Sequence, residues 1–182
     1  MGKVLWHTTM SLDGFIAGSK GEMDWMFGHS GPRPEVFQEI LRTTGAALTG
    51  RRSYDAGAKV GKRVYGGAFT GPVFVLTHQP PEDDDPQITF LTGEIATAVD
   101  TARAAAGDRN VVLIGANVAQ QCIAAGLVDE VLVHVVPALV GDGTRLFDSP
   151  GTSSVRLETI DVAPSGDLVD LRYRVVGEAA RG

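Results

Sequence analysis

The sequence predicts an α/β fold whose central sheet is mixed but mostly parallel, with helices on both faces and an antiparallel hairpin at the C-terminal end. Short apolar segments alternate with segments of helical periodicity through most of the chain. The last strands differ, because residues 154–162 and 168–176 alternate around the turn Pro164-Ser165-Gly166. A length of 182 residues suits one core, so we expect a single domain over residues 1–182.

Composition narrows the classes of function. The net charge of −6 argues against nucleic acid or an anionic membrane as a partner. No apolar run is long enough to cross a membrane and no signal peptide precedes the first strand, so we expect a cytoplasmic protein. Cys122, the single cysteine, is expected to be a small buried helix residue. The sequence lacks a deaminase zinc motif, and we expect no metal site.

The chain begins with a predicted strand over residues 3–10, and its content of β-formers favours a central position in the sheet. Asp13-Gly14 then marks a turn. A loop rich in glycine and proline follows at residues 19–34, and its methionine, tryptophan and phenylalanine side chains need either the core or a ligand to cover them. An amphipathic helix starts at its end and continues to about Gly45.

Two more strands are predicted in the first half. Residues 46–49 form a short buried strand, after which Gly50 opens a second helix. The glycine-rich stretch at residues 57–71 is expected to be the most flexible part of the chain. The third strand, at residues 72–77, leads towards a solvated acidic loop at residues 82–85.

The second half continues the alternation of strand and helix, with glycine after the helices and β-branched runs in the strands. Its predicted elements are a strand at 88–91, a helix at 93–106, a strand at 111–114, a helix at 117–125, a strand at 128–136 and a loop at 141–144 that precedes the hairpin.

Three junctions that follow strands carry the residues from which function can be argued. Gly50-Arg51-Arg52 and Ile114-Gly115-Ala116 each open a helix, and His78 follows the third strand. The carboxyl ends of parallel strands line one crevice, and helix N-termini with nearby arginines bind anions. The junctions therefore indicate a site for a phosphorylated ligand. The alternative interpretation is that the glycines serve packing alone and that the arginines are solvated.

Taken together, these segments resemble the dihydrofolate reductase-like superfamily. The most similar branch contains the reductase domain of the bifunctional riboflavin-biosynthesis deaminase/reductase and its stand-alone relatives. The similar segments follow the family order over residues 4–147, and they are residues 11–17, 48–54, 75–78, 112–116 and 126–131, with Pro137, Gly141-Asp142-Gly143 and Leu146-Phe147. The dinucleotide fingerprint G-x-G-x-x-G is absent. The resemblance implies a dihydrofolate reductase-like three-layer sandwich.

The resemblance also implies NADPH as the cofactor, bound across the strand ends. The nicotinamide would lie near Thr9, Ile16 and Ala17, the pyrophosphate on the two helix starts, and the 2′-phosphate near Arg51, Thr77 and His78. The full set of residues implied for the cofactor is Thr9, Ile16, Ala17, Gly50, Arg51, Arg52, Ser53, Leu76, Thr77, His78, Ile114, Gly115, Ala116, Asn117 and Val118.

The substrate side is defined by fewer residues. Dihydrofolate reductases hold the pterin with a carboxylate on the helix before the second strand, and Glu35 is the nearest candidate, with Gln38 one turn on. Glu35 is equally a helix-start residue favoured by the dipole. Asp24, beside Trp25 in the loop, is a second candidate for handling a proton. Glu35 and Asp24 are therefore the catalytic candidates, and Trp25 and Gln38 are the substrate-binding candidates.

Three functions follow as hypotheses. The preferred one is an NADPH-dependent reductase that transfers hydride to a small heterocycle or a related carbonyl or imine. A ribityl phosphate on its substrate would suit Lys59, Lys62 and Arg63, which are otherwise solvated loop charges. The second is a true dihydrofolate reductase, and the third is a non-catalytic dinucleotide-binding protein. The resemblance implies a homodimer, and the apolar strand 128–136 and the hairpin are the expected interface.

Overall fold

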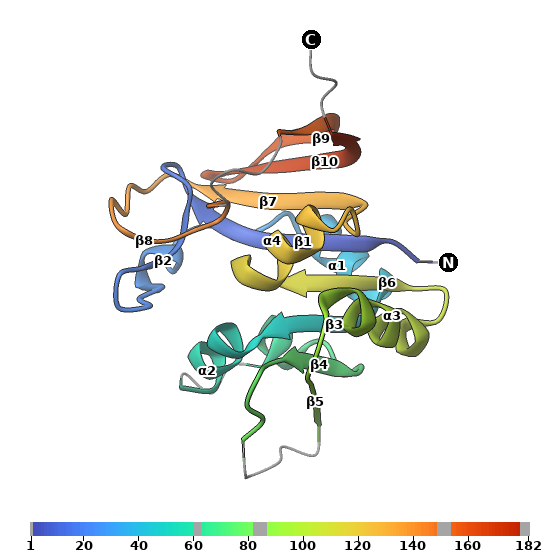
Figure 1. The fold of residues 1–182 in the computed structure, drawn as a ribbon. Helices are drawn as coiled ribbons and strands as arrows, with labels where there is room; N and C mark the ends of the chain where they lie inside the picture. Colours follow the sequence, from blue (N-terminus) through green and yellow to red (C-terminus); the bar gives the residue numbers. More distant parts are fainter. Residues whose placement is uncertain (1, 60–62, 82–86, 149–153, 179–182) are drawn as a thin grey trace.

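A single large sheet organises the computed structural model of this chain, which describes residues 2–59, 63–81, 87–148 and 154–178. Eight strands form it in the order β5-β4-β3-β6-β1-β7-β10-β9, and β2 pairs with β8 in a small second sheet (Figure 1). The strands are β1 (Val4–Ser11), β2 (Phe15–Gly18), β3 (Thr44–Gly50), β4 (Val73–Leu76), β5 (Ile88–Leu91), β6 (Asn110–Ile114), β7 (Glu130–Val136), β8 (Gly143–Arg145), β9 (Val155–Ser165) and β10 (Leu168–Glu178). The helices are α1 (Pro34–Thr43), α2 (Arg51–Lys59), α3 (Ile95–Ala106) and α4 (Ala116–Ala124), with short 3₁₀ turns η1 (Asp24–Met26) and η2 (Val64–Gly67).

The predicted mixed, mostly parallel sheet is confirmed. All pairs from β5 to β7 are parallel, whereas β10 runs antiparallel to β7 and β9 antiparallel to β10. β1 lies between β6 and β7, in the central position expected for it. The hairpin turn lies two residues later than its sequence suggests, because Ser165 still pairs with Leu168 and leaves Gly166-Asp167 as the turn. The positive φ of Gly166 suits that position.

Helices cover both faces of the sheet, as expected. Figure 1 shows α3 and α4 in front of the sheet and α1 behind it. Val4 and Trp6 pack towards α3 and α4, whereas Leu5 packs with Ile40 of α1 on the opposite face. This alternation follows from the two-residue period of a strand, and it lets one short apolar segment serve two cores. Cys122 lies fully buried in the first core, and burial raises the pKa of its thiol to about 12.

The loop expected at residues 141–144 contains strand β8, which pairs with β2. A Cβ atom on Gly143 would lie 2.1 Å from the carbonyl oxygen of Ala17, so only glycine permits this close pairing. The Asp13 carboxylate fastens the same region by accepting the backbone N–H groups of Val140 and Gly141. Asp13 of the predicted turn therefore ties the start of the chain to the β7–β8 connection.

Two expectations lie outside the described residues, namely the acidic loop at 82–85 and the role of Lys62; the structure describes the backbone but not the side chain of Lys59. Within the described part of the chain, no helix is long and apolar enough to span a bilayer.

Candidate functional site

Two adjoining cavities reach the carboxyl ends of parallel strands, where ligands bind in open α/β sheets, and the larger one extends to the starts of β4 and β5. The smaller, of about 300 Å³, is enclosed by residues from all three of the predicted junctions. It is lined by Gly50, Arg51, Arg52, Ser53, Leu76, Thr77, His78, Gly93, Gly115, Asn117, Val118 and Gln121. The structure thus brings together most of the residues assigned to the phosphates from the sequence.

The larger cavity, of about 1270 Å³, lies next to the smaller one. Four residues line both cavities, and they are Arg52, Ser53, Gly115 and Asn117. Because these residues open α2 and α4, the two cavities meet at the helix N-termini. One extended ligand can therefore occupy both cavities and place an anion where they meet.

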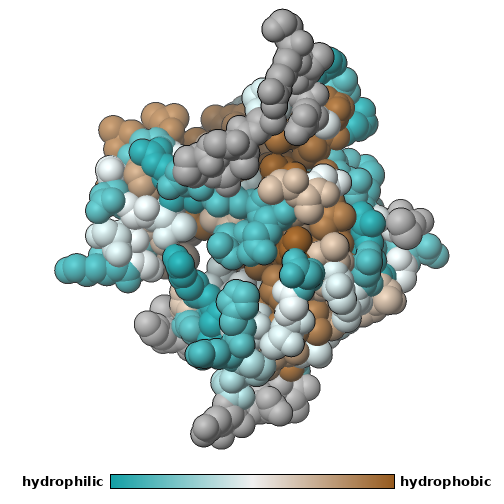
Figure 2. All heavy atoms as spheres, viewed as in Figure 1, coloured by the Kyte–Doolittle hydropathy of each residue, from teal (hydrophilic) through white to brown (hydrophobic). Residues whose placement is uncertain are grey.

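The start of α4 is shaped for a close approach of a ligand to the backbone. Gly115 has φ +91° and caps the helix without a side-chain hydrogen bond from any described residue, which leaves the first amide groups of α4 for a ligand. Ala116 is the first residue of the helix and does not have a positive φ, so its methyl group causes no backbone strain. Figure 2 shows hydrophilic residues gathered over this region of α2 and α4.

Gly115→Ala is expected to lower the free energy of unfolding by about 2 kcal/mol, because it adds both backbone strain and overpacking. A Cβ atom there would lie 2.1 Å from Ser53 Oγ and would also force alanine into φ +91°. Gly126→Ala is the matched control, since Gly126 has φ +67° with open space around it, and about 1 kcal/mol is expected. Denaturant unfolding of both variants checks this. Equal losses would show that the Ser53 contact is irrelevant.

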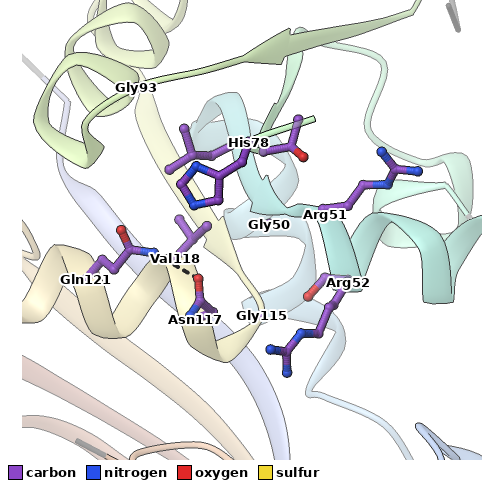
Figure 3. Close-up of a pocket in the computed structure, with 12 residues that line it drawn as sticks. Gly50, Arg51, Arg52, His78, Gly93, Gly115, Asn117, Val118 and Gln121 are labelled. Atoms are coloured by element: carbon purple, nitrogen blue, oxygen red, sulfur yellow. Dashed lines mark hydrogen bonds between the residues drawn. The ribbon is translucent and has the colours of Figure 1, made fainter. Parts of the chain in front are cut away.

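The two arginines at the start of α2 have different surroundings. Arg51 donates from Nε to Asp55 over 2.8 Å and from Nη1 to the Gln79 carbonyl oxygen over 2.9 Å. Figure 3 shows its guanidinium extending away from the His78 ring, whereas Arg52 extends past Gly115. Arg52 is the one that reaches the junction of the two cavities, so it suits an anion held there better than Arg51 does.

The residues implied for the nicotinamide all line the larger cavity. Thr9, Ile16 and Ala17 lie there together with Met23, Met26 and Phe37, and Ile114 and Ala116 also line it. Met23 and Met26 belong to the loop at 19–34, so that loop forms part of the cavity wall, as its apolar residues indicated.

The candidates for the substrate side lie elsewhere. Asp24, Glu35 and Gln38 are exposed, and Trp25 donates from its indole nitrogen to the Glu22 carbonyl oxygen over 3.3 Å. None of the four is among the described residues that line either cavity. Their roles stay predictions that the geometry does not support, whereas Arg63 does line the larger cavity.

A buried hydrogen-bonded chain of titratable side chains reaches the larger cavity, and sequence reasoning missed it. Tyr65 Oη lies 2.7 Å from His7 Nδ1, His7 Nε2 lies 2.8 Å from His134 Nε2, and His134 Nδ1 lies 2.6 Å from Asp170 Oδ1. Tyr65 and both histidines line the cavity. We call these four residues the buried relay.

Arg33 fixes the far end of the buried relay. Its Nε donates to Asp170 Oδ2 over 3.0 Å and its Nη2 donates to Asp161 over 2.5 Å. Burial and the neighbouring His134 lower the pKa of His7 to about 3, and burial raises the pKa of Tyr65. The sequence does hold a signal for these residues, because His7 and His134 each interrupt a strand that is otherwise suited to the core.

The fold is dihydrofolate reductase-like. The Enterococcus faecalis dihydrofolate reductase, solved with NADP(H), superposes with a TM-score of 0.63 at 14% identity over 96% of each chain. At 14% identity, this similarity shows a shared fold and nothing further.

The chain belongs to the RibD C-terminal domain family, whose model matches residues 2–169. It is similar to the uncharacterized protein YwjB of Bacillus subtilis, with 24% identity over 171 residues, which cover 94% of this chain and 97% of YwjB. A candidate riboflavin biosynthesis protein of Shewanella sp. PV-4 has the same fold, with a TM-score of 0.80 and 23% identity over 96% of this chain and 99% of that one. Membership puts the chain among the riboflavin-reductase-like oxidoreductases.

Proposed function

We propose that this protein is an NADPH-dependent reductase that acts on a small heterocyclic carbonyl or imine. The observation that carries the proposal is the pair of cavities that meet at the N-termini of α2 and α4. The larger cavity has room for a nicotinamide ring and a substrate together, since ligand sites commonly measure about 300–1000 Å³. We also propose that the protein is located in the cytoplasm.

The residues present fit the cofactor. The start of α4 at Gly115, which no described side chain caps with a hydrogen bond, suits a pyrophosphate, and Arg52 adds charge beside it. Thr77 and His78 in the smaller cavity suit a further phosphate. When bound, NADPH supplies a hydride. The chain's own contribution is to hold the rings, exclude water and supply the proton that must accompany the hydride.

A titration with NADPH, NADH and flavins tests the proposal first. We expect NADPH to bind, and we then expect loss of NADPH absorbance with either a ribosylaminopyrimidine phosphate or dihydrofolate as the probe substrate. Turnover of dihydrofolate alone would favour a true dihydrofolate reductase. Binding without turnover of any pterin or pyrimidine would favour a non-catalytic binding protein, and the absence of binding would overturn the proposal.

Arg51→Ala is expected to weaken NADPH about tenfold and to leave NADH nearly unchanged, because only NADPH carries the 2′-phosphate. Arg52→Ala is the matched control, since Arg52 lies where the cavities meet and is assigned to the pyrophosphate that both cofactors carry. It should weaken NADPH and NADH alike. Fluorescence titration of both variants with both cofactors decides this, and an equal loss of NADPH and NADH in Arg51→Ala would reject the assignment.

A homodimer is also part of the proposal. The strand predicted at 128–136 is buried inside the sheet, so its apolar side chains are covered by the chain itself. The hairpin instead exposes Leu157, Val162 and Val169, which favours β9 and β10 as the interface.

A further inference from the structure

The positions of the protons in the buried relay follow from its charged end. Asp170 pairs with Arg33, so it is a carboxylate and accepts a hydrogen bond from His134 Nδ1. A neutral His134 then has its lone pair on Nε2 and accepts from His7 Nε2. His7 Nδ1 in turn has a lone pair and accepts from the Tyr65 hydroxyl. In this first state, the Tyr65 proton points at His7 and away from the cavity.

One added proton reverses every hydrogen bond between Tyr65 and His134. When His134 carries protons on both nitrogens, its Nε2 donates to His7 Nε2, and the single proton of His7 moves to Nδ1. His7 Nδ1 then donates to the Tyr65 oxygen, and the Tyr65 hydroxyl proton becomes available to the cavity. The positive charge stays on His134 against Asp170, and His7 is neutral in both states.

We propose that Tyr65 is the catalytic proton donor of the cavity and that His7, His134 and Asp170 are positioning residues that reload it. The proposal rests on the reductase function given above. With the hydride on the substrate carbon, the Tyr65 O–H bond breaks and a new N–H or O–H bond forms on the substrate. The Tyr65 oxygen takes the proton of His7 Nδ1, and His7 Nε2 takes that of His134 Nε2. One hydride and one proton are consumed, and His134 regains its proton when Tyr65 accepts one from the cavity and Tyr65 and His7 each pass a proton on along the same hydrogen bonds.

Two further observations support this assignment. Tyr65 is the only non-glycine residue with a positive φ among the described residues, at φ 52° and ψ 38°, and such strained positions cluster at functional sites. Its ring packs edge-on against Phe37 with centroids 5.8 Å apart, which helps to hold the hydroxyl on His7. The lowered pKa of His7 agrees with a residue that passes a proton on while staying neutral.

The relay is expected to depend on pH through His134. The charged and titratable side chains around it come from five other elements, and they are His7 of β1, Asp170 of β10, Asp161 of β9, Arg33 before α1, and Tyr65 and the adjoining Arg63 at η2. Within this cluster, Asp170 and Asp161 share the guanidinium of Arg33.

The decisive measurement is NMR of the protein labelled with ¹⁵N-histidine, because ring nitrogen shifts report each tautomer without any substrate. The chain has four histidines, and His29→Gln and His78→Gln variants assign the remaining two. On acidification we expect His7 to move from the Nε2–H to the Nδ1–H tautomer at the pH where His134 gains its second proton. In Tyr65→Phe the acceptor of His7 Nδ1–H is gone, so we expect His7 of this variant to keep its Nε2–H tautomer over the pH range in which wild-type His7 changes tautomer.

Either of two results would overturn the relay. One is that His7 of the wild-type protein keeps its Nε2–H tautomer at every pH, and the other is that His134 remains singly protonated until the protein unfolds. Both results concern the relay alone, since NADPH binding and turnover test the reductase function separately.

Kinetics with the probe substrate that turns over provide a second readout. Tyr65→Phe should lower the single-turnover rate about 100-fold and leave the NADPH affinity within about twofold of wild type. The wild-type rate should fall as the pH rises past the His134 midpoint, because the proton is then missing, and the variant should lose this dependence. An unchanged rate in Tyr65→Phe would overturn the role of Tyr65.

Discussion

Asp170→Ala is expected to lower the free energy of unfolding by about 3 kcal/mol, because it leaves buried groups without their partner. The Asp170 side chain is 2% exposed and accepts hydrogen bonds from both His134 and Arg33. Without it, His134 Nδ1–H has no acceptor in an equally buried place. In the variant, Arg33 keeps its contact with Asp161. The expected loss of unfolding free energy therefore lies near the lower end of the range for a broken buried ion pair.

Asp161→Ala is the matched control for that measurement. Asp161 contacts the same guanidinium, but its side chain is 47% exposed, and exposed ion pairs contribute about 0–1 kcal/mol. Urea unfolding of the two variants, followed by circular dichroism, gives both values. Similar small losses would mean that the buried relay is not rigidly held by its carboxylate.

Acid is expected to destabilise the protein through His7, by about 1.4 kcal/mol for each pH unit between pH 6.5 and pH 3. Burial first, and then the neighbouring His134, lower the pKa of His7 from 6.5 to about 3 in the folded protein. The unfolded chain therefore takes up a proton on His7 at a pH where the folded protein does not. The stabilisation is complete above pH 6.5 and is lost as the pH falls towards 3.

The comparison that isolates this effect is the slope of unfolding free energy against pH in wild type and in His7→Gln. The variant should show a shallower slope in the acid range by the amount given above. Tyr65→Phe keeps His7 buried and should keep the wild-type slope, so it controls for the loss of the hydrogen bond alone. A His7→Gln slope equal to that of wild type would show that His7 is protonated in the folded protein.

Most of the fold follows from local patterns in the sequence. The strand at residues 111–114 and the helix after Gly115 are set by an apolar run and a glycine, and both signals lie within a few residues. Strand β8 was not predicted because Gly143, Thr144 and Arg145 carry no apolar alternation; its pairing with β2 is fixed by the close backbone contact at Gly143. The hairpin turn was placed early because Pro164 and Ser165 look like turn residues, whereas the cross-strand pairing extends through them.

The candidate site likewise has one part that local sequence patterns predict and another part that they do not. Arg52, Thr77 and Gly115 follow strands of one sheet, so a rule about strand ends brings them together. His7 and His134 are 127 residues apart, and Tyr65 joins them from a glycine-rich segment that has no periodicity. Which polar side chains face one another across β1, β7 and β10 depends on strand order and register, and neither is contained in a local pattern.

The hairpin described above has a consequence for how the cavity can be altered. Asp167 and Ser165 in and beside its turn hold Ser30 and Gly31 of the loop at 19–34, and the strands hold Arg33. Met23 and Met26, which form the cavity wall, lie in the other half of the same loop. The residues that form the cavity wall and the residues that the hairpin holds are therefore separate parts of this loop. Exchanging the two methionines offers a way to redesign which molecules the cavity admits while the proton chemistry stays as it is.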